Sequence, residues 1–122
     1  MIRTGCIYYV QDERVSMPPE DKRPRHNSRT VIVVNSPEHC ANEDWPIVMV
    51  CPVSSGDRGS PHDVKVGAGI GGLRKKGYVR VALMQPMDKR HFADWVSPNP
   101  VPRDIMDEVH LRIMKYLRGA GG

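Results

Sequence analysis

The sequence lacks the segments that would direct a protein into or across a membrane. Nowhere does it contain the run of about 18 or more apolar residues that a membrane-spanning helix requires. Its first residues, Met1 to Cys6, contain no charged segment followed by a long apolar run, which is the pattern of a secretory signal peptide. We therefore expect no membrane association and a location in the cytoplasm.

Cysteine is also scarce. The three cysteines, Cys6, Cys40 and Cys51, are odd in number, and two of them lie in apolar, strand-like runs. Reduced thiols with a structural role explain this pattern better than a disulfide framework, which again favours the cytosol. His39 stands beside Cys40, but no CxxC or HxxxH pair provides the close spacing of a tetrahedral metal site. We expect no bound metal.

Two further motifs of enzyme sites are absent or incomplete. No GxSxG segment is present, so the nucleophile elbow of many serine hydrolases is missing. Gly67, Gly69 and Gly72 match the GxGxxG pattern of dinucleotide-binding loops, but a basic segment and then a strand follow them, where that site needs a helix. We interpret these glycines as a flexible connection between strands and expect no cofactor.

What the chain does contain is typical of one small soluble domain. It has 122 residues, of which 39% are hydrophobic and 26% are charged. Lysine and arginine number 18 against 14 aspartates and glutamates, which gives a net charge of +4 and suits a polyanionic partner, although many basic proteins bind no nucleic acid. We expect a single domain over residues 1–119 and a tail at 120–122.

Five runs of β-branched, aromatic or alternating residues predict strands, and segments rich in turn-forming residues bound them. The connections are too short for the helical crossovers of a parallel sheet, so these runs predict a strongly bent antiparallel sheet or a small barrel. The five predicted strands are residues 6–10, 30–34, 47–53, 62–66 and 78–84.

The pattern changes to helical periodicity at residues 102–118. Ile105, Val109 and Ile113 form one apolar row that is typical of a helix packed against a core. Pro102 suits the first turn of this helix, and Gly119 suits the residue that ends it. The sequence therefore predicts one C-terminal helix.

Two segments between these elements are predicted differently. Residues 11–28 are polar, carry a basic cluster that includes Lys22, and show no apolar period, so we expect a long mobile loop between the first two strands. Residues 88–95 are expected to form a short helix or turn that packs Phe92 and Trp95 under the barrel.

One arginine and two serines stand at strand ends that antiparallel pairing would bring together. Arg29 immediately precedes the second predicted strand, and Ser54 and Ser55 follow the third. RNA can be cut without a metal ion when its own 2′-hydroxyl attacks the adjacent phosphate, which requires proton transfer at both oxygens and a cation facing the charge on phosphorus. Arginine suits this last role because it is always charged and can bind phosphate with two N–H groups. Taken alone, however, such an arginine is usually a solvated surface charge and such serines usually form a turn.

Three segments together resemble the MazF/PemK family of toxins. Residues 29–35 resemble the family's strand of Arg-Pro followed by apolar residues, and residues 50–55 resemble its apolar-Pro-apolar-Thr-Ser segment. Residues 77–90 are similar to the family's strand that ends in an aliphatic-Asp-Lys turn. No single motif is distinctive, but their order and spacing agree with the family from Met1 to about Gly119.

The resemblance implies a mainly β fold with one helix, namely a small SH3-like antiparallel barrel of the MazF/CcdB type with a C-terminal helix. It also implies a homodimer that acts as a toxin, a sequence-selective endoribonuclease that cleaves single-stranded mRNA. The expected products are a 2′,3′-cyclic phosphate and a 5′-hydroxyl, and an antitoxin protein is the expected partner.

The family's catalytic positions correspond to Arg29, which would stabilise the phosphorane, and Ser54. Thr30 replaces the usual proline, Ser54 a threonine and Gly77 a frequent serine, and serine keeps the hydroxyl but loses a methyl group that restricts its rotamer. We therefore expect activity to survive in weakened form. Further residues are predicted to bind RNA phosphates or bases: Arg23, Arg25, His26, Asn35, Ser55, Lys75, Lys76, Arg80 and Gln85.

Two other functions compete with this interpretation. SH3-like barrels often bind peptides or nucleic acid without chemistry, and the three substitutions are compatible with such a module. Barrels that resemble this family also include inhibitors of DNA gyrase, for which Trp95 or the methionine-rich helix would matter in place of Arg29.

Overall fold

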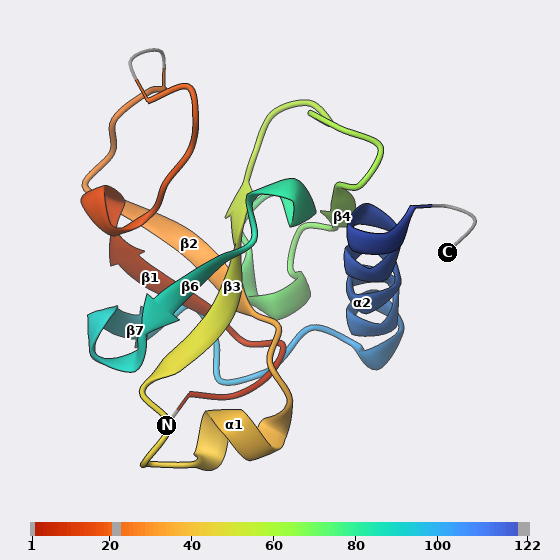
Figure 1. The fold of residues 1–122 in the computed structure, drawn as a ribbon. Helices are drawn as coiled ribbons and strands as arrows, with labels where there is room; N and C mark the ends of the chain where they lie inside the picture. Colours follow the sequence, from red (N-terminus) through yellow and green to blue (C-terminus); the bar gives the residue numbers. More distant parts are fainter. Residues whose placement is uncertain (1, 21–22, 120–122) are drawn as a thin grey trace.

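The computed structural model of the chain describes residues 2–20 and 23–119 and consists of one antiparallel sheet and two helices (Figure 1). The strand order is β4-β5-β3-β2-β1-β7, and β6 pairs with β3 off this path. The strands are β1 Ile7–Gln11, β2 Ser28–Val33, β3 Ile47–Ser54, β4 Val64–Val66, β5 Gly77–Val79, β6 Gln85–Asp88 and β7 Phe92–Trp95. The helices are α1 Pro37–Ala41 and α2 Arg103–Arg118, and short 3-10 turns lie at Asp12–Arg14, Ile70–Gly72, Val81–Leu83 and Lys89–His91.

The mainly β fold with a C-terminal helix is confirmed, and the structure refines two details of the prediction. The sheet has seven strands, not five. It is also open, because β4 and β7 end the path and are not paired with each other within the described residues. The result is a bent antiparallel sheet, which is one of the two arrangements that the strand pattern predicted.

The central strands β2 and β3 are apolar over residues 31–33 and 47–53, because both faces of the sheet are covered along most of these segments. Ile32 and Cys51 are fully buried in one core, and Val31 and Val50 are fully buried in the other. Alternate residues of a strand point to opposite faces, so two covered faces require a continuous apolar run. The β-branched residues that predicted these strands therefore belong to two cores.

Helix α2 covers the first of these cores. Val109 is fully buried and Met106 is nearly so, and both belong to the cluster that contains Ile32. The His110 Nε2 atom lies 2.9 Å from the carbonyl oxygen of Val34, which ties the helix to the end of β2. The predicted helix at 102–118 is confirmed apart from its first residue, because Pro102 precedes the first helical turn.

The strand predicted at residues 78–84 is interrupted. β5 ends at Val79 and pairs with the end of β3 (Val79 with Val53), whereas β6 pairs with the earlier part of β3 (Gln85 with Val50). A 3-10 turn between them moves the chain along the same edge of β3 and still buries Val81 completely. Because the turn also contains a buried valine, the alternation of apolar and polar residues continues through it. The sequence pattern therefore predicted one strand where the structure has two.

Two other predicted elements also differ. The strand predicted at 62–66 begins only at Val64, because Asp63 lies in a turn. Part of the segment predicted as a helix or turn at 88–95 forms β7, which pairs with β1 as an edge strand. Phe92 is half-buried and packs edge-on against Tyr8 with ring centroids 5.2 Å apart, but Trp95 is 46% exposed and is not under the sheet.

Candidate active site at the ends of β2 and β3

A groove of about 430 Å³ lies where the end of β3 meets the beginning of β2. The loops that follow β1 and β3 rise from this end of the sheet, and α1 lies at the opposite end (Figure 1). Thr30 pairs with Val53 at the end of the β2–β3 ladder. Arg29, just before Thr30, and Ser54, just after Val53, therefore lie directly beyond this last pair. Both residues line the groove, which confirms that the two strand ends meet there.

The Arg29 side chain is held by a carboxylate from the end of β1. Its Nε donates a hydrogen bond to Asp12 Oδ1 at 2.6 Å, and an Nη2 hydrogen is donated to the carbonyl oxygen of Pro24. Only 11% of the Arg29 side chain is exposed. Among the described residues, no partner is found for Nη1 of Arg29, so part of the guanidinium remains available.

Asp12 is shared by three arginines. In addition to Arg29, Arg23 donates to Asp12 Oδ1 at 2.6 Å and Arg25 approaches Oδ2 at 3.5 Å. The hydrogen bond from Arg29, helped by the charge and hydrogen bond of Arg23, lowers the pKa of Asp12 to about 2. The carboxylate is therefore charged at neutral pH, and it joins the β1–β2 loop to the base of β2.

Ser54 has a different cationic neighbour. Its Oγ accepts a hydrogen bond of 2.8 Å from Nε of Arg80, the residue after β5. The same guanidinium forms an ion pair of 2.7 Å with Asp63, whose side chain is only 3% exposed. The two predicted catalytic residues thus line one groove but belong to separate ion-pair clusters.

Three cations surround the ring of Tyr78 in β5 beside this cluster. The guanidinium carbon of Arg80 lies 5.1 Å from the ring centroid, that of Arg58 lies 5.4 Å away and Lys76 Nζ lies 6.0 Å away. Cations over an aromatic face are attracted by its negative electrostatic potential. Tyr78 therefore helps to gather positive charge at the edge of the groove, together with Asp63.

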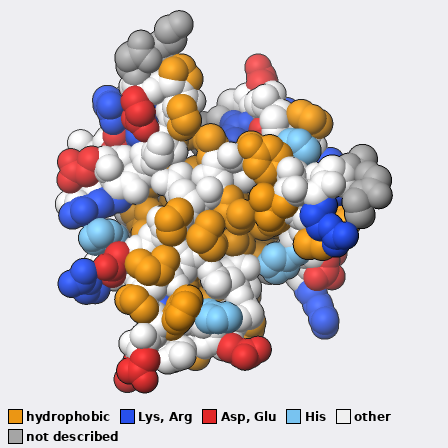
Figure 2. All heavy atoms as spheres, viewed as in Figure 1, with side chains coloured by type: hydrophobic (Ala, Val, Ile, Leu, Met, Phe, Trp, Pro, Cys, Tyr) orange, Lys and Arg blue, Asp and Glu red, His pale blue; other side chains and the backbone are white. Residues whose placement is uncertain are grey.

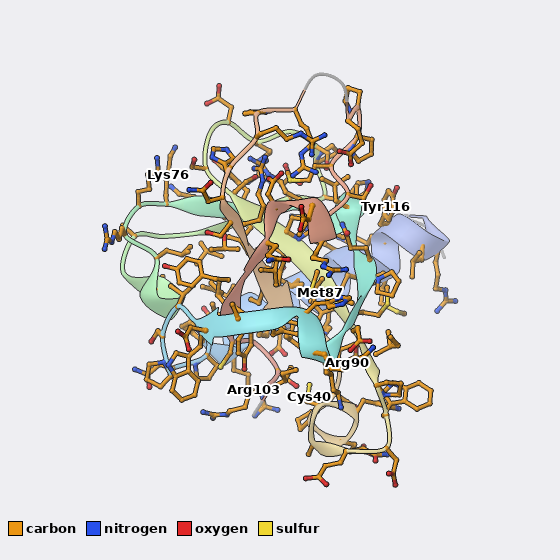
Figure 3. The ribbon with its side chains drawn as sticks, turned by 90° about the vertical axis from the view of Figure 1, so that its left-hand side faces the viewer. Cys40, Lys76, Met87, Arg90, Arg103 and Tyr116 are labelled. Atoms are coloured by element: carbon orange, nitrogen blue, oxygen red, sulfur yellow. The ribbon has the colours of Figure 1, made fainter. Side chains whose placement is uncertain are left out.

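Four of the residues predicted to bind RNA line the groove: His26, Ser55, Lys75 and Lys76. All four are exposed, and Figure 3 shows Lys76 at the periphery of the molecule, far from Cys40 and the α1 end. Arg25 is exposed in a neighbouring hollow that His26 also lines. Gly72, which also lines the groove, has a positive φ and lies so near Ser97 that a side chain there would clash.

The other four residues predicted to bind RNA are not placed in the groove. Asn35 lies beyond the far end of β2, and its side-chain oxygen accepts from the backbone N–H of Met49. The side-chain amide of Gln85 accepts a hydrogen bond from the backbone N–H of Ser16 and donates one to its carbonyl oxygen. Arg23 is 4% exposed and bound to Asp12, and Arg80 is bound to Asp63. The charge or polarity of these four side chains is visible in the sequence, but their internal partners are not.

The structure also adds site residues that the sequence analysis did not identify. Asp12 directly follows β1 and Asp63 directly precedes β4, and acidic residues in a predicted nucleic-acid site could have signalled internal partners for the arginines. No group of three or more histidine, cysteine or acidic side chains that could hold a metal ion is found within residues 2–20 and 23–119. In the same part of the chain, no helix is long and apolar enough to cross a membrane.

The three cysteines are all buried as free thiols. Burial raises the pKa of Cys51 to about 12, so its thiol is protonated and a poor nucleophile at neutral pH. Cys51 lies in β3 and is fully buried in the core, apart from the groove. The structural role predicted for the cysteines agrees with these positions.

Solved structures of related fold cover nearly the whole chain. A MazE–MazF complex from Deinococcus radiodurans matches with 18% identity, coverage of 95% of this chain and 94% of that chain, and a TM-score of 0.70. An endoribonuclease in complex with its cognate antitoxin from a mycobacterial species matches with 14% identity, coverage of 94% and 91%, and a TM-score of 0.64. The Mycobacterium tuberculosis toxin MazF-mt6 matches with 16% identity, coverage of 92% and 95%, and a TM-score of 0.63.

At such low identities, these structural matches establish the fold alone. The family is established by a match of the sequence. No protein of curated function matches the sequence significantly. Residues 3–117, however, match the family described as the PemK-like, MazF-like toxin of type II toxin–antitoxin systems. The match includes every described strand, helix α1, all of α2 except Arg118, and the whole groove. The chain therefore belongs to the PemK-like, MazF-like toxin family.

Proposed function

We propose that the protein is a toxin that cleaves single-stranded mRNA in the cytoplasm, selectively for sequence and without a metal ion. The observation that carries this proposal is the groove in which Arg29 and Ser54 stand at adjoining strand ends. Family membership supports the toxin role, and two proteins of the same fold are described as an endoribonuclease with its antitoxin and as a MazF toxin.

The groove has the charge that a single-stranded RNA requires. Arg74, Lys75 and Lys76 form one wall, and all three are exposed. Tyr9, which is 40% exposed at the other side, offers an aromatic face for an unstacked base. Lysine and arginine side chains follow the phosphate backbone of a single strand, while aromatic faces hold its bases.

In the proposed reaction, the 2′-oxygen of the RNA attacks the adjacent phosphorus as its proton is removed. The bond from phosphorus to the 5′-oxygen of the next nucleotide then breaks, and that oxygen receives a proton. The products are a 2′,3′-cyclic phosphate and a 5′-hydroxyl. Arg29 stabilises the charge on the phosphorane, and Ser54 donates a hydrogen bond to a phosphate oxygen. Asp12 holds Nε of Arg29 and so orients the remaining N–H groups.

The test is incubation of the purified protein with a long single-stranded RNA in excess EDTA, beside the Arg29→Ala variant. Arg103→Ala is the matched control, because Arg103 is exposed at the start of α2 and distant from Lys76 (Figure 3). Discrete fragments with 5′-hydroxyl ends, absent for Arg29→Ala and present for Arg103→Ala, would support the proposal. RNA that is bound but remains intact would instead identify a binding module.

An antitoxin protein is the second partner that we propose. Type II toxins are paired with protein antitoxins by the definition of the family, and two of the matching structures are complexes with an antitoxin. The net charge of +4 suits an acidic antitoxin segment. Expression of the protein alone is expected to arrest growth, and co-expression of its antitoxin is expected to restore it.

We also propose that the protein forms a homodimer, because one of its faces exposes hydrophobic side chains. Figure 2 shows hydrophobic side chains gathered at the centre of the face that carries β3 and α2, with charged side chains at the periphery. Leu117 and Met114 in α2 are 65% and 50% exposed, and Ile47 in β3 is 38% exposed. Exposed apolar side chains on one face are typical of an interface. Sedimentation equilibrium should show a dimer that Leu117→Lys dissociates, whereas Trp95→Lys in β7 should leave it intact.

A further inference from the structure

Asp63 is the most deeply buried carboxylate among the described residues, and it anchors the loop that follows β3. Its side chain is 3% exposed. Asp63 Oδ2 accepts hydrogen bonds from the backbone N–H groups of Gly59 at 2.7 Å and Ser60 at 3.1 Å. Because these donors are backbone atoms of a tight turn, the carboxylate has a fixed position. The Arg80 guanidinium binds the same oxygen at 2.7 Å, which gives the arginine a fixed anchor as well.

All five N–H groups of Arg80 can be assigned to acceptors within the protein. Nη1 donates to Asp63 and to the carbonyl oxygen of Asp57 at 3.0 Å, and Nε donates to Ser54 Oγ at 2.8 Å. Nη2 donates to the carbonyl oxygens of Ser55 at 3.1 Å and, more weakly, of Ser54 at 3.5 Å. A guanidinium has five N–H donors, so none remains for an RNA phosphate. Arg80 is therefore placed to orient Ser54, not to bind RNA itself.

The hydrogen bond from Arg80 determines what Ser54 can do. Serine χ1 has three staggered positions, and serine lacks the methyl group with which a threonine restricts them. When Ser54 Oγ accepts from Arg80 Nε, the oxygen is held in one position and one of its lone pairs is occupied. The hydroxyl proton then points away from the guanidinium. The nearby positive charge also makes the hydroxyl a better donor and a poorer base.

We propose that Asp63 and Arg80 are positioning residues, which fix the rotamer of Ser54 and present its hydroxyl as a hydrogen-bond donor to the scissile phosphate. This inference rests on the proposed function, because it concerns the role of Ser54 in RNA cleavage. It assigns to a buried ion pair the rotamer restriction that the methyl group of threonine supplies at the corresponding position of the family. It also replaces the direct RNA contact predicted for Arg80.

The first test compares RNA cleavage by Asp63→Asn and by the double variant Asp63→Asn with Ser54→Thr. Loss of positioning by Asp63→Asn should lower kcat on the order of 10- to 100-fold with little change in KM, because a small displacement of a reacting group has effects of this size. Adding Ser54→Thr should restore much of the loss, because the methyl group again limits the rotamer. The gain from Ser54→Thr alone should be smaller, since Arg80 already holds the hydroxyl.

The controls separate positioning from folding. Asp44→Asn makes the same change of charge at an exposed residue beyond α1, at the other end of the sheet, and should cleave at the wild-type rate. If Asp63→Asn fails to fold, Arg80→Lys replaces it, because lysine keeps the charge but cannot donate to Ser54 and Asp63 as a fork. Cleavage by Asp63→Asn at the wild-type rate, or a double variant as slow as Asp63→Asn, would overturn the proposal.

A second measurement does not depend on activity. In ¹⁵N–¹H NMR spectra, the Nε–H of Arg80 should exchange slowly with water, and Ser54→Ala should shift its signal and speed its exchange. Rapid exchange of this proton in the wild-type protein would refute the positioning inference even if RNA is cleaved. Slow exchange combined with intact RNA would refute the proposed function and leave the hydrogen-bonded cluster in place.

Discussion

The two loops at the groove each use one aspartate to hold an arginine, and they do so in different ways. The Asp12 carboxylate is bound by side chains alone, namely Arg23 and Arg25 from the β1–β2 loop and Arg29 from the beginning of β2. Asp63 is bound by backbone N–H groups together with the side chain of Arg80. An anchor made of side chains can rearrange, whereas an anchor made of backbone donors is fixed.

This difference predicts different roles for the two arginines. Arg29 keeps Nη1 without a partner among the described residues, so it can bind a phosphate without losing its bond to Asp12. Arg80 has each of its N–H groups assigned and holds Ser54. Burial alone does not distinguish the two roles, since the Arg29 and Arg80 side chains are about equally buried, at 11% and 12% exposed.

The largest expected effect is the loss of Arg29. Arg29→Ala should slow RNA cleavage roughly 100-fold or more, because it removes a positioned donor from the transition state. Arg29→Lys keeps the charge but not the planar fork, so it should recover only a small part of the rate. Single-turnover cleavage of a short RNA measures both variants. Arg29→Ala with a rate close to that of the wild type would show that the β1–β2 cluster has no catalytic role.

An intermediate effect is expected on stability in acid. The pKa of Asp12 is lowered to about 2 in the folded protein, so its interactions stabilise the fold above its unfolded pKa of about 4 and are lost as the pH falls through about 2. Asp12→Asn should therefore reduce the difference in unfolding free energy between about pH 5 and about pH 2. Urea denaturation at both pH values tests this. An unchanged difference would mean that the three arginines do not stabilise the Asp12 carboxylate.

The smallest expected effect concerns RNA affinity. Lys76→Ala should lower the slope of log Kd against log salt concentration by about 0.7, the value for one phosphate contact to a single strand. Lys115→Ala, an exposed residue in the last turn of α2, is the matched control. Fluorescence anisotropy with a labelled RNA, in the Arg29→Ala background to prevent cleavage, gives both slopes. Equal slopes for the two variants would remove Lys76 from the RNA path.

The sequence predicted those features that depend on local patterns. The β-branched runs predicted β1, β2 and β3, and the apolar row of Ile105, Val109 and Ile113 predicted α2. The positions of Arg29 and Ser54 at adjoining strand ends followed from antiparallel pairing. Each of these predictions needs only the geometry of one element or of two neighbouring strands.

Features that depend on distant partners could not be predicted in this way. Arg80 alternates with apolar residues as a solvent-facing strand residue does, but its position is set by Asp63, seventeen residues earlier in the chain. The charge of Arg23 is likewise taken up by Asp12, which a local pattern does not show. The β5–β6 break depends on the length of β3, which is long enough to pair with two successive strands.

The most direct test of RNA cleavage by its own 2′-hydroxyl uses a modified substrate. Once the cut site of a short RNA is mapped, a 2′-deoxynucleotide is placed on its 5′ side, and cleavage in excess EDTA and binding are measured for both RNAs. The proposed mechanism predicts that the modified RNA binds with similar Kd but is no longer cut at that position. Continued cutting there would contradict the mechanism, because the nucleophile would then be water or a protein group.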